Sequence, residues 1–319
     1  MMFIKIIKSI IIIIYIFIVI KNKLKKDLRV GLCVIGKNEN LYAREFVEHY
    51  KKIGYDNIIL YDNNDKNDKD DKFEDVINDY IKDGFVRIID FKERNGNERP
   101  LFVAYKDCYS KYNSEYDWLS FFDMDEFLEL NEKYKNIKEF LNDKIFTICQ
   151  AIKINWLFYI NDNILYYENK TLRERMKKIT YDDLHSKHIK STVRGNLYRN
   201  YWENIVNSHT SNLNYTSCSS SGKIVESNSP FIYPPDYTNA KLKHYYYKSF
   251  EEFCVKIKRG MISLPKNNSN QIINERYEEL IRHNKNNSEK LKIIHMIFND
   301  NNYNIFLNNI NDSFAHLIF

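Results

Sequence analysis

Short apolar runs alternate with helix-period segments from Arg29 to Phe122, and this alternation constrains the fold more than any other feature of the sequence. Four of the runs read as β-strands, at residues 30–35, 57–61, 85–89 and 118–122. The segments between them repeat apolar residues every three or four positions, as a helix with one buried face does. Such strand–helix units build parallel sheets covered by helices, because right-handed crossovers return each strand in the same direction. We therefore predict an α/β fold with a doubly wound, mostly parallel sheet flanked by helices.

Glycine, proline and capping residues mark the ends of the predicted helices. A helix over 41–53 stops before Gly54. Asp71 and Glu74 fit a capping box at the start of the next helix, and a proline at residue 100 suits the first turn of the third.

Beyond residue 150 the pattern loosens. We expect short strands, a Ser-rich loop over 217–222, a helix over about 250–259 and a polar, Asn-rich helical tail after Pro265.

Composition excludes two classes of protein. With 44% hydrophobic residues the chain can bury a core, so disorder throughout is excluded. A net charge of +5, from 48 basic and 43 acidic residues, gives no basic stripe, and we expect no nucleic-acid partner. The five cysteines are scattered without metal-ligand spacing, so they define neither a zinc site nor a disulfide framework, and the odd count leaves at least one thiol unpaired.

The N-terminal segment predicts a membrane anchor. Residues 9–20 are twelve uncharged, mostly aliphatic residues, and flanking lysines extend the segment by snorkelling. No small-x-small cleavage site follows, which favours an uncleaved helix. The five basic residues after it against two before it favour a cytosolic body. Secretory-pathway enzymes place the body in the lumen, and sequons in an Asn-rich chain do not decide between the two.

Two carboxylates follow the most apolar strand. Asp123 and Asp125 come directly after residues 118–122, at the edge where a parallel sheet binds its ligands. One or two carboxylates hold Mn²⁺ or Mg²⁺ while leaving positions for phosphate oxygens, which suits a nucleotide diphosphate leaving group. Asp68 and Asp70 have the same spacing in a solvated turn, so the strand context carries the prediction.

Polar residues also follow the first two strands. Lys37, Asn38 and Glu39 open the first helix, where backbone N–H groups and the helix dipole can face a ligand. After the second strand, the run 62–64 places a carboxylate within reach of a ribose or base. The alternative is an Asx turn over 62–64 and an ordinary first-turn charge at Glu39. The three residues of that run are Asp62, Asn63 and Asn64.

Eight segments together resemble a known family. They are CVIGKNENLYAREFVEHY (33–50), LYDNN (60–64), AYKDCY (104–109), YDWLSFFDMDEFL (116–128), INW (154–156), HIKSTVRG (188–195), SPF (229–231) and LKHYYYKSFEEFCVKIKRG (242–260). In this order they resemble the membrane-linked GT-A glycosyltransferases of the family 2-like and family 92 group. The resemblance implies a nucleotide-sugar donor, a divalent metal at the Asp-x-Asp motif and an inverting single displacement.

The resemblance also assigns roles by position. Asp123 corresponds to the carboxylate that faces ribose and metal, and Asp125 to the one that faces metal and diphosphate. His244 corresponds to a late histidine that returns to the metal or the diphosphate; the alternative is a packed, hydrogen-bonded side chain. Lys190 and Arg194 correspond to a basic segment that neutralises phosphate; the alternative is a surface strand.

An inverting transfer needs a general base, usually a carboxylate, to take the proton of the acceptor hydroxyl. The candidates are Asp162, in a polar loop after an apolar strand, and Glu174, with Glu203 behind them. Glu174 lies between two arginines, where a structural ion pair is the alternative. Pro100 and Ser208 depart from residues common in the family, Gln and Pro, and neither departure touches the Asp-x-Asp motif.

These observations predict three parts: an anchor with a basic flank (1–26), a GT-A domain (27–262) and a polar helical extension (263–319). The domain divides into a nucleotide-binding half (27–130) and an acceptor half (131–262). The function that follows is transfer of a hexose from a nucleotide-sugar, with a UDP-sugar as the first choice, to a glycan or glycolipid. A non-catalytic binding module of the same fold is the alternative. A nucleotidyl or phosphoryl transferase would need a phosphate-cradling loop, and residues 219–223 lack its upstream glycine.

Overall fold

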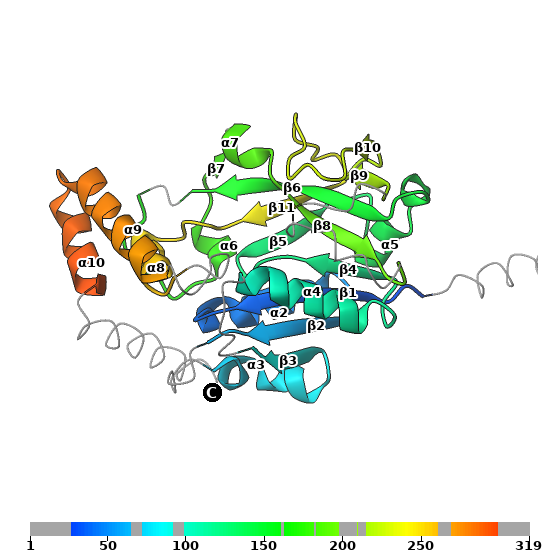
Figure 1. Ribbon diagram of the computed structural model, residues 1–319, viewed down its shortest axis with the longest axis horizontal. Helices are drawn as coiled ribbons and strands as arrows, with labels where there is room; N and C mark the ends of the chain where they lie inside the picture. Colours follow the sequence, from blue (N-terminus) through cyan, green and yellow to red (C-terminus); the bar gives the residue numbers. More distant parts are fainter. Residues whose placement is uncertain are drawn as a thin grey trace, which may run out of the picture.

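The computed structural model describes residues 27–64, 72–91, 99–160, 163–181, 183–197, 209, 215–260 and 269–298. It is a mixed α/β fold, with a curled sheet and helices on its faces and at one end (Figure 1). The strands are β1 (Val30–Gly36), β2 (Asn57–Asp62), β3 (Val86–Asp90), β4 (Trp118–Phe121), β5 (Glu126–Leu130), β6 (Ala151–Tyr159), β7 (Ile179–Thr180), β8 (Ile189–Arg194), β9 (Ser217–Ser219), β10 (Ile224–Val225) and β11 (Ala240–His244). The helices are α2 (Asn40–Lys52), α3 (Phe73–Lys82), α4 (Pro100–Tyr112), α5 (Ile137–Leu141), α6 (Leu172–Arg175), α7 (Asp183–Ser186), α8 (Phe250–Lys258), α9 (Ser269–Asn284) and α10 (Ser288–Phe298), with a 3₁₀ turn η1 (Lys144–Phe146).

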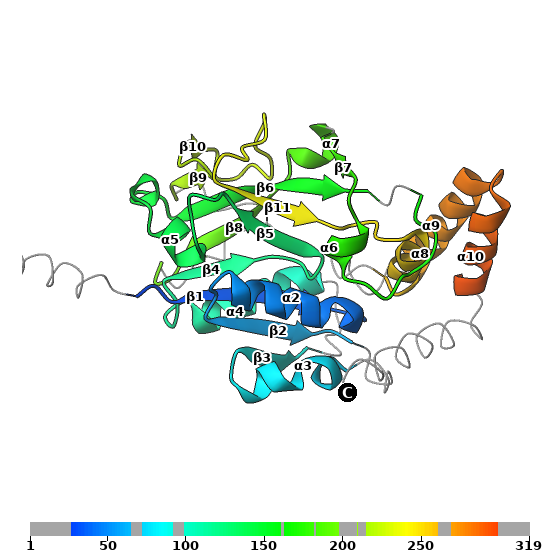
Figure 2. The same ribbon diagram turned by 180° about the vertical axis from the view of Figure 1, so that it is seen from behind.

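Strands β1 to β4 form the parallel unit that the sequence predicts. β1 pairs in parallel with β2 on one side and β4 on the other, and β3 pairs in parallel with β2. Alternate side chains of β1 enter two cores: Leu32 and Val34 pack toward α2, and Cys33 and Ile35 pack toward α4. Both faces are thus buried, which is why these strands are continuous apolar runs. The two views show α4 in front of the sheet and α2 behind it (Figures 1 and 2).

The second half of the sheet is mixed, which corrects the prediction of a mostly parallel sheet. β8 runs antiparallel to both β4 and β6, and β11 runs parallel to β6 but antiparallel to β5. The described helices between β5 and β8 have only four or five residues, too short for the crossover connections that return a strand in parallel. The predicted Ser-rich loop is also wrong in part, because Ser217–Ser219 form the buried strand β9.

The helix ends agree with the glycine and proline signals, with one exception. Gly54 adopts a left-handed φ of 94° after α2, and Pro100 lies in the first turn of α4. The exception is α3, whose N-cap is Lys72 and has no side-chain capping hydrogen bond, so the capping box that includes Glu74 is wrong. Asp71 lies outside the described residues.

The polar tail folds as two helices that pack on α8. Phe250, Cys254 and Ile257 of α8 share a core with Leu280 of α9 and Ile294 of α10. These helices extend the fold at one end of the sheet (Figure 2). Within the described residues no helix is long and apolar enough to span a membrane, and the predicted anchor at 1–26 lies outside them.

Four cysteines form disulfides that the sequence spacing does not reveal. Cys33 of β1 is bonded to Cys108 of α4, and Cys149 is bonded to Cys218 of β9. Cys254 is free and buried, in agreement with the expected unpaired thiol. The pairs are 75 and 69 residues apart, so only the fold brings them together.

Candidate functional site

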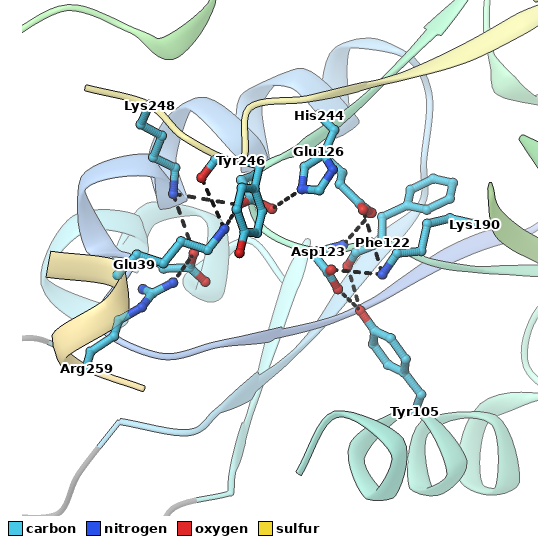
Figure 3. Close-up of polar contacts among 12 residues, drawn as sticks. Glu39, Tyr105, Phe122, Asp123, Glu126, Lys190, His244, Tyr246, Lys248 and Arg259 are labelled. Carbon is cyan, nitrogen blue, oxygen red and sulfur yellow. Dashed lines mark hydrogen bonds and ion pairs between the residues drawn. The ribbon is translucent and has the colours of Figure 1, made fainter. Parts of the chain in front are cut away.

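The two aspartates of the Asp-x-Asp motif lie where the sequence places them, in the turn between β4 and β5. Figure 3 shows Asp123 with its partners Tyr105 and Lys190. Asp123 accepts hydrogen bonds from the Tyr105 hydroxyl at 3.0 Å and from the Lys190 ammonium at 2.8 Å. Its side chain is 27% exposed, whereas that of Asp125 is 5% exposed. Asp123 therefore presents a carboxylate to an incoming ligand more readily than Asp125 does.

Asp125 lies among basic side chains. Lys256 donates a hydrogen bond to its Oδ2 at 2.7 Å, and the Lys248 ammonium is 3.9 Å from the same oxygen. Nε2 of His244 is 3.5 Å from the other carboxylate oxygen, Oδ1. Burial alone raises the pKa of Asp125, but the charge of Lys256, the hydrogen-bonding contact with His244 and the charge of Lys248 together hold it well below its usual range. Asp125 is therefore ionised, with Oδ1 turned toward the imidazole.

His244 and Asp125 together fit a divalent cation. Burial lowers the pKa of His244, so its imidazole is neutral and keeps a lone pair for a metal. Nε2 is the nitrogen that faces Asp125 Oδ1, and the other ring nitrogen, Nδ1, is a buried atom without a hydrogen-bond partner in the described structure. No group of three or more His, Cys, Asp or Glu side chains poised for a metal occurs among the described residues. A carboxylate with an imidazole is nevertheless enough for Mn²⁺ or Mg²⁺ where diphosphate oxygens and water complete the coordination.

The strand-end loops meet beside this turn. The Asn38 N–H donates to Asn64 Oδ1 at 2.6 Å, and the Asn64 N–H donates to Asp62 Oδ1 at 3.0 Å. The Asn63 N–H donates to the Gly36 carbonyl at 2.9 Å. Asp62, Asn63 and Asn64 are buried, and the Asx turn considered above does form. It ties the end of β2 to the loop that opens α2.

Glu39 is bound by Arg259, which lies 220 residues later in the sequence. Its Oε1 accepts a hydrogen bond from the Arg259 guanidinium at 2.8 Å, and the carboxylate is 3% exposed. Arg259 also donates to the backbone carbonyls of Lys37 and Asn38. Asn38 adopts a left-handed φ of 48°. The loop is thus fixed by Asn64 on one side and by Arg259 on the other.

Helix α8 contributes a charged face that the sequence reasoning missed. Glu252, Lys256 and Arg259 are spaced i, i+4 and i+7, so they share one side of the helix. All three contact residues 27–130: Lys256 and Arg259 as described above, and Glu252 by accepting the Tyr42 hydroxyl at 2.6 Å. Charged residues at helical spacing opposite an apolar face were the signal for this contact.

Glu126 is a second residue that was missed. It is fully buried, and its Oε2 accepts the Asp123 N–H at 2.9 Å. The Lys190 ammonium is 3.7 Å from Oε1. Burial raises the pKa of Glu126 well above its usual range, with the charge of Asp123 adding to the effect. Glu126 orients the backbone of the first aspartate.

The structure brings Lys190 to the site but not Arg194. β8 runs antiparallel to β4 and pairs Arg194 with Trp118, at the opposite end of β4 from Asp123. Four residues of strand separate the two basic groups by about 13 Å. Arg194 donates to the Cys149 carbonyl at 2.6 Å and stacks on the Trp118 ring, so phosphate neutralisation by Arg194 is a wrong prediction.

Of the two candidate bases, Glu174 lies within the described residues and Asp162 does not. Glu174 is exposed and completes a capping box at the start of α6 by accepting the Thr171 N–H at 2.9 Å. Asp162 and Glu203 lie outside the described residues. The identity of the base stays a prediction.

A search of curated proteins finds no significant match. S. aureus TarS (1–349) aligns at 11% identity over 82% of this chain and 74% of its own, with a TM-score of 0.35. The structure of the same protein in complex with UDP aligns at 14% identity over 81% of this chain and 72% of its own, with a TM-score of 0.37.

A mannosyltransferase, PcManGT from Pyrobaculum calidifontis, in complex with GDP-Man and Mn²⁺, aligns at 11% identity over 41% of this chain, with a TM-score of 0.28. The chain spans 36% of the length of that protein. The model of glycosyltransferase family 92 matches residues 26–305. The chain therefore belongs to glycosyltransferase family 92.

Proposed function

We propose that the protein is a metal-dependent, inverting glycosyltransferase that transfers a hexose from a nucleotide-sugar to a glycan or glycolipid. A UDP-sugar is the first donor to test. The observation that carries this proposal is the placement of Asp123 and Asp125 at the carboxyl edge of a parallel sheet, beside the 37–39 loop and facing the basic residues of α8.

In this proposal each carboxylate has its own role. Asp125 and His244 hold Mn²⁺ or Mg²⁺, which would neutralise the diphosphate leaving group when bound. Asp123, the more exposed carboxylate, accepts a ribose hydroxyl and is kept ionised and oriented by Lys190 and Tyr105. The pKa of Asp123 supports this role: burial alone would raise it, but the Lys190 ammonium lowers it below the usual range.

Inversion requires one base on the acceptor side of the sugar. Asp162 is our candidate, because in the sequence it lies in a polar segment that follows an apolar strand. Glu174 is the second candidate and would have to leave its capping contact with Thr171 to act.

Donor hydrolysis tests the proposal. The protein is incubated with UDP- and GDP-sugars in Mn²⁺ and then in EDTA, and nucleotide release is measured. We expect metal-dependent release from one donor, and loss of nearly all release in Asp125→Asn, measured at a temperature where circular dichroism shows that the variant is folded. Asp83→Asn is the matched control, because Asp83 also pairs with a lysine but lies on the surface after α3.

Two other outcomes would contradict parts of the proposal. Full activity of Asp125→Asn would remove the metal assignment. Nucleotide binding without turnover, with any donor and acceptor tried, would favour a binding module of the same fold.

We also propose that the body folds in an oxidising compartment, the secretory-pathway lumen, tethered by the N-terminal segment. The support is the pair of disulfides, Cys33–Cys108 and Cys149–Cys218, since such bonds persist in oxidising environments. This is the orientation opposite to the one that the count of basic residues favours.

A further inference from the structure

Lys248 occupies a conformation that lysine rarely adopts. It lies between β11 and the N-cap of α8, Ser249, with a left-handed φ of 53°. For a residue with a long side chain, this region costs about 1 kcal/mol or more. Strain of this kind concentrates at ligand sites, where the surrounding structure holds a side chain in a required position.

The ammonium of Lys248 is enclosed but not tightly paired. Its side chain is 2% exposed and lies over the Tyr42 ring, with Nζ 3.8 Å from the ring centroid. The nearest carboxylate oxygens are Glu39 Oε1 at 3.7 Å and Asp125 Oδ2 at 3.9 Å. Both distances exceed that of an N–H···O hydrogen bond, about 2.7–3.2 Å.

Each of these carboxylates already has a cation at hydrogen-bond distance. Arg259 is 2.8 Å from Glu39, and Lys256 is 2.7 Å from Asp125. Three cations therefore face two anions, and one positive charge is in surplus. Burying a positive charge that is not fully neutralised is costly, so an additional anion bound here would stabilise the arrangement.

We propose that Lys248 is a binding residue for the diphosphate of the nucleotide-sugar donor. The inference rests on the proposed function and deepens it. The ammonium lies between Asp125 and Glu39, between the Asp-x-Asp turn and the loop that opens α2 (Figure 3). A diphosphate oxygen at this point supplies the hydrogen-bonded anion that Lys248 lacks in its two carboxylate contacts.

The test is equilibrium binding of UDP and GDP to Lys248→Asn, compared with the matching nucleoside. Asparagine tolerates the left-handed backbone and removes the charge. For whichever diphosphate the wild-type protein binds, we expect the variant to bind about 10- to 100-fold more weakly, and the nucleoside to bind equally to both proteins. Lys248→Arg, which keeps the charge, should recover most of the affinity.

Lys51→Asn is the matched control, because Lys51 also lies over an aromatic ring, that of Tyr80, and pairs with Asp83 on the surface. It should bind the diphosphate as the wild-type protein does. Thermal unfolding without nucleotide completes the comparison: removing a surplus charge should not lower the Tm of Lys248→Asn. If that variant does not fold, Lys248→Gln, which keeps the stem over Tyr42, is measured in the same way.

Three results would overturn the assignment. Diphosphate binding by the folded variant at wild-type affinity removes Lys248 from the site. An equal loss for nucleoside and diphosphate makes its role structural. Absence of binding of either diphosphate to the wild-type protein overturns the proposed function itself, and the Lys248 assignment with it.

Discussion

The buried ion pair between Glu252 and Arg175 allows a quantitative prediction. Glu252 accepts two hydrogen bonds from the Arg175 guanidinium, at 2.5 and 2.6 Å, and others from Tyr42 and Ser249. The two side chains are 1% and 2% exposed. Glu252→Gln removes the charge, while the amide oxygen can still accept the Ser249 N–H. It leaves Arg175 charged and buried, which costs about 3–5 kcal/mol in comparable pairs.

The pKa of Glu252 gives a second value for the same quantity. Burial alone would raise this pKa, but hydrogen bonds and charge from Arg175 lower it to about 2, from a usual 4.5. By linkage, this difference corresponds to about 3 kcal/mol of folding free energy. Because the folded-state pKa is depressed, the contribution is complete above pH 4.5 and is lost as the pH falls toward 2.

The assay is urea unfolding of both proteins at pH 7 and at a series of lower pH values. We expect the difference in unfolding free energy to be about 3–5 kcal/mol at pH 7 and to shrink below pH 4.5. Glu168→Gln is the control, since Glu168 pairs with Lys170 at 2.9 Å but both side chains are more than half exposed; it should change nothing measurable. A Glu252→Gln difference below about 1 kcal/mol at pH 7, or one that does not depend on pH, would refute the reasoning.

Two further predictions concern the framework. Alkylation of the denatured, unreduced protein should label one thiol, Cys254, and reduction should raise the count to five; three or more labelled thiols before reduction would contradict the disulfides. Gly195→Ala should prevent stable folding, because its Cβ would lie 1.8 Å from the Tyr116 carbonyl oxygen and 2.4 Å from that of Asn113. Gly84→Ala, where no atom lies within 4 Å of the added Cβ, should cost only about 1 kcal/mol for its left-handed backbone, and equal solubility and Tm for the two variants would contradict the packing argument.

The sequence predicts the first half of the fold because its strands are buried on both faces. β1 and β4 are buried along their whole length, with Ser120 as a polar exception in β4, and Gly54 and Pro100 mark helix ends by backbone chemistry. In the second half, β9 is a buried strand of Ser-Cys-Ser whose Ser219 hydroxyl donates to a carboxylate, that of Asp236. Local hydrophobic pattern does not distinguish such a strand from a loop.

The sequence likewise predicts some residues of the candidate site and not others. Asp123, Asp125 and Glu39 meet because the carboxyl ends of neighbouring parallel strands meet, which follows from topology. Arg194 is misplaced because its distance from Asp123 depends on the antiparallel direction of β8, which the sequence does not reveal. Lys248 reaches the candidate site through its ion pair with Glu39, a residue more than 200 positions earlier in the sequence. Only the folded chain shows that contact.

The path of α8 sets an order for assembly during synthesis. Arg259 and Glu39 are 220 residues apart, and Lys256 and Asp125 are 131 apart. When the first 130 residues have left the ribosome, the strands that carry both carboxylates are present, but the cations that pair with them have not been made. Until residue 259 emerges, Glu39 and Asp125 therefore lack the α8 partners that they have in the folded protein, and a truncation before α8 would remove Lys256 and Arg259 but leave both carboxylates. The contact between α8 and the Asp-x-Asp turn can therefore form only after more than 250 residues have been made.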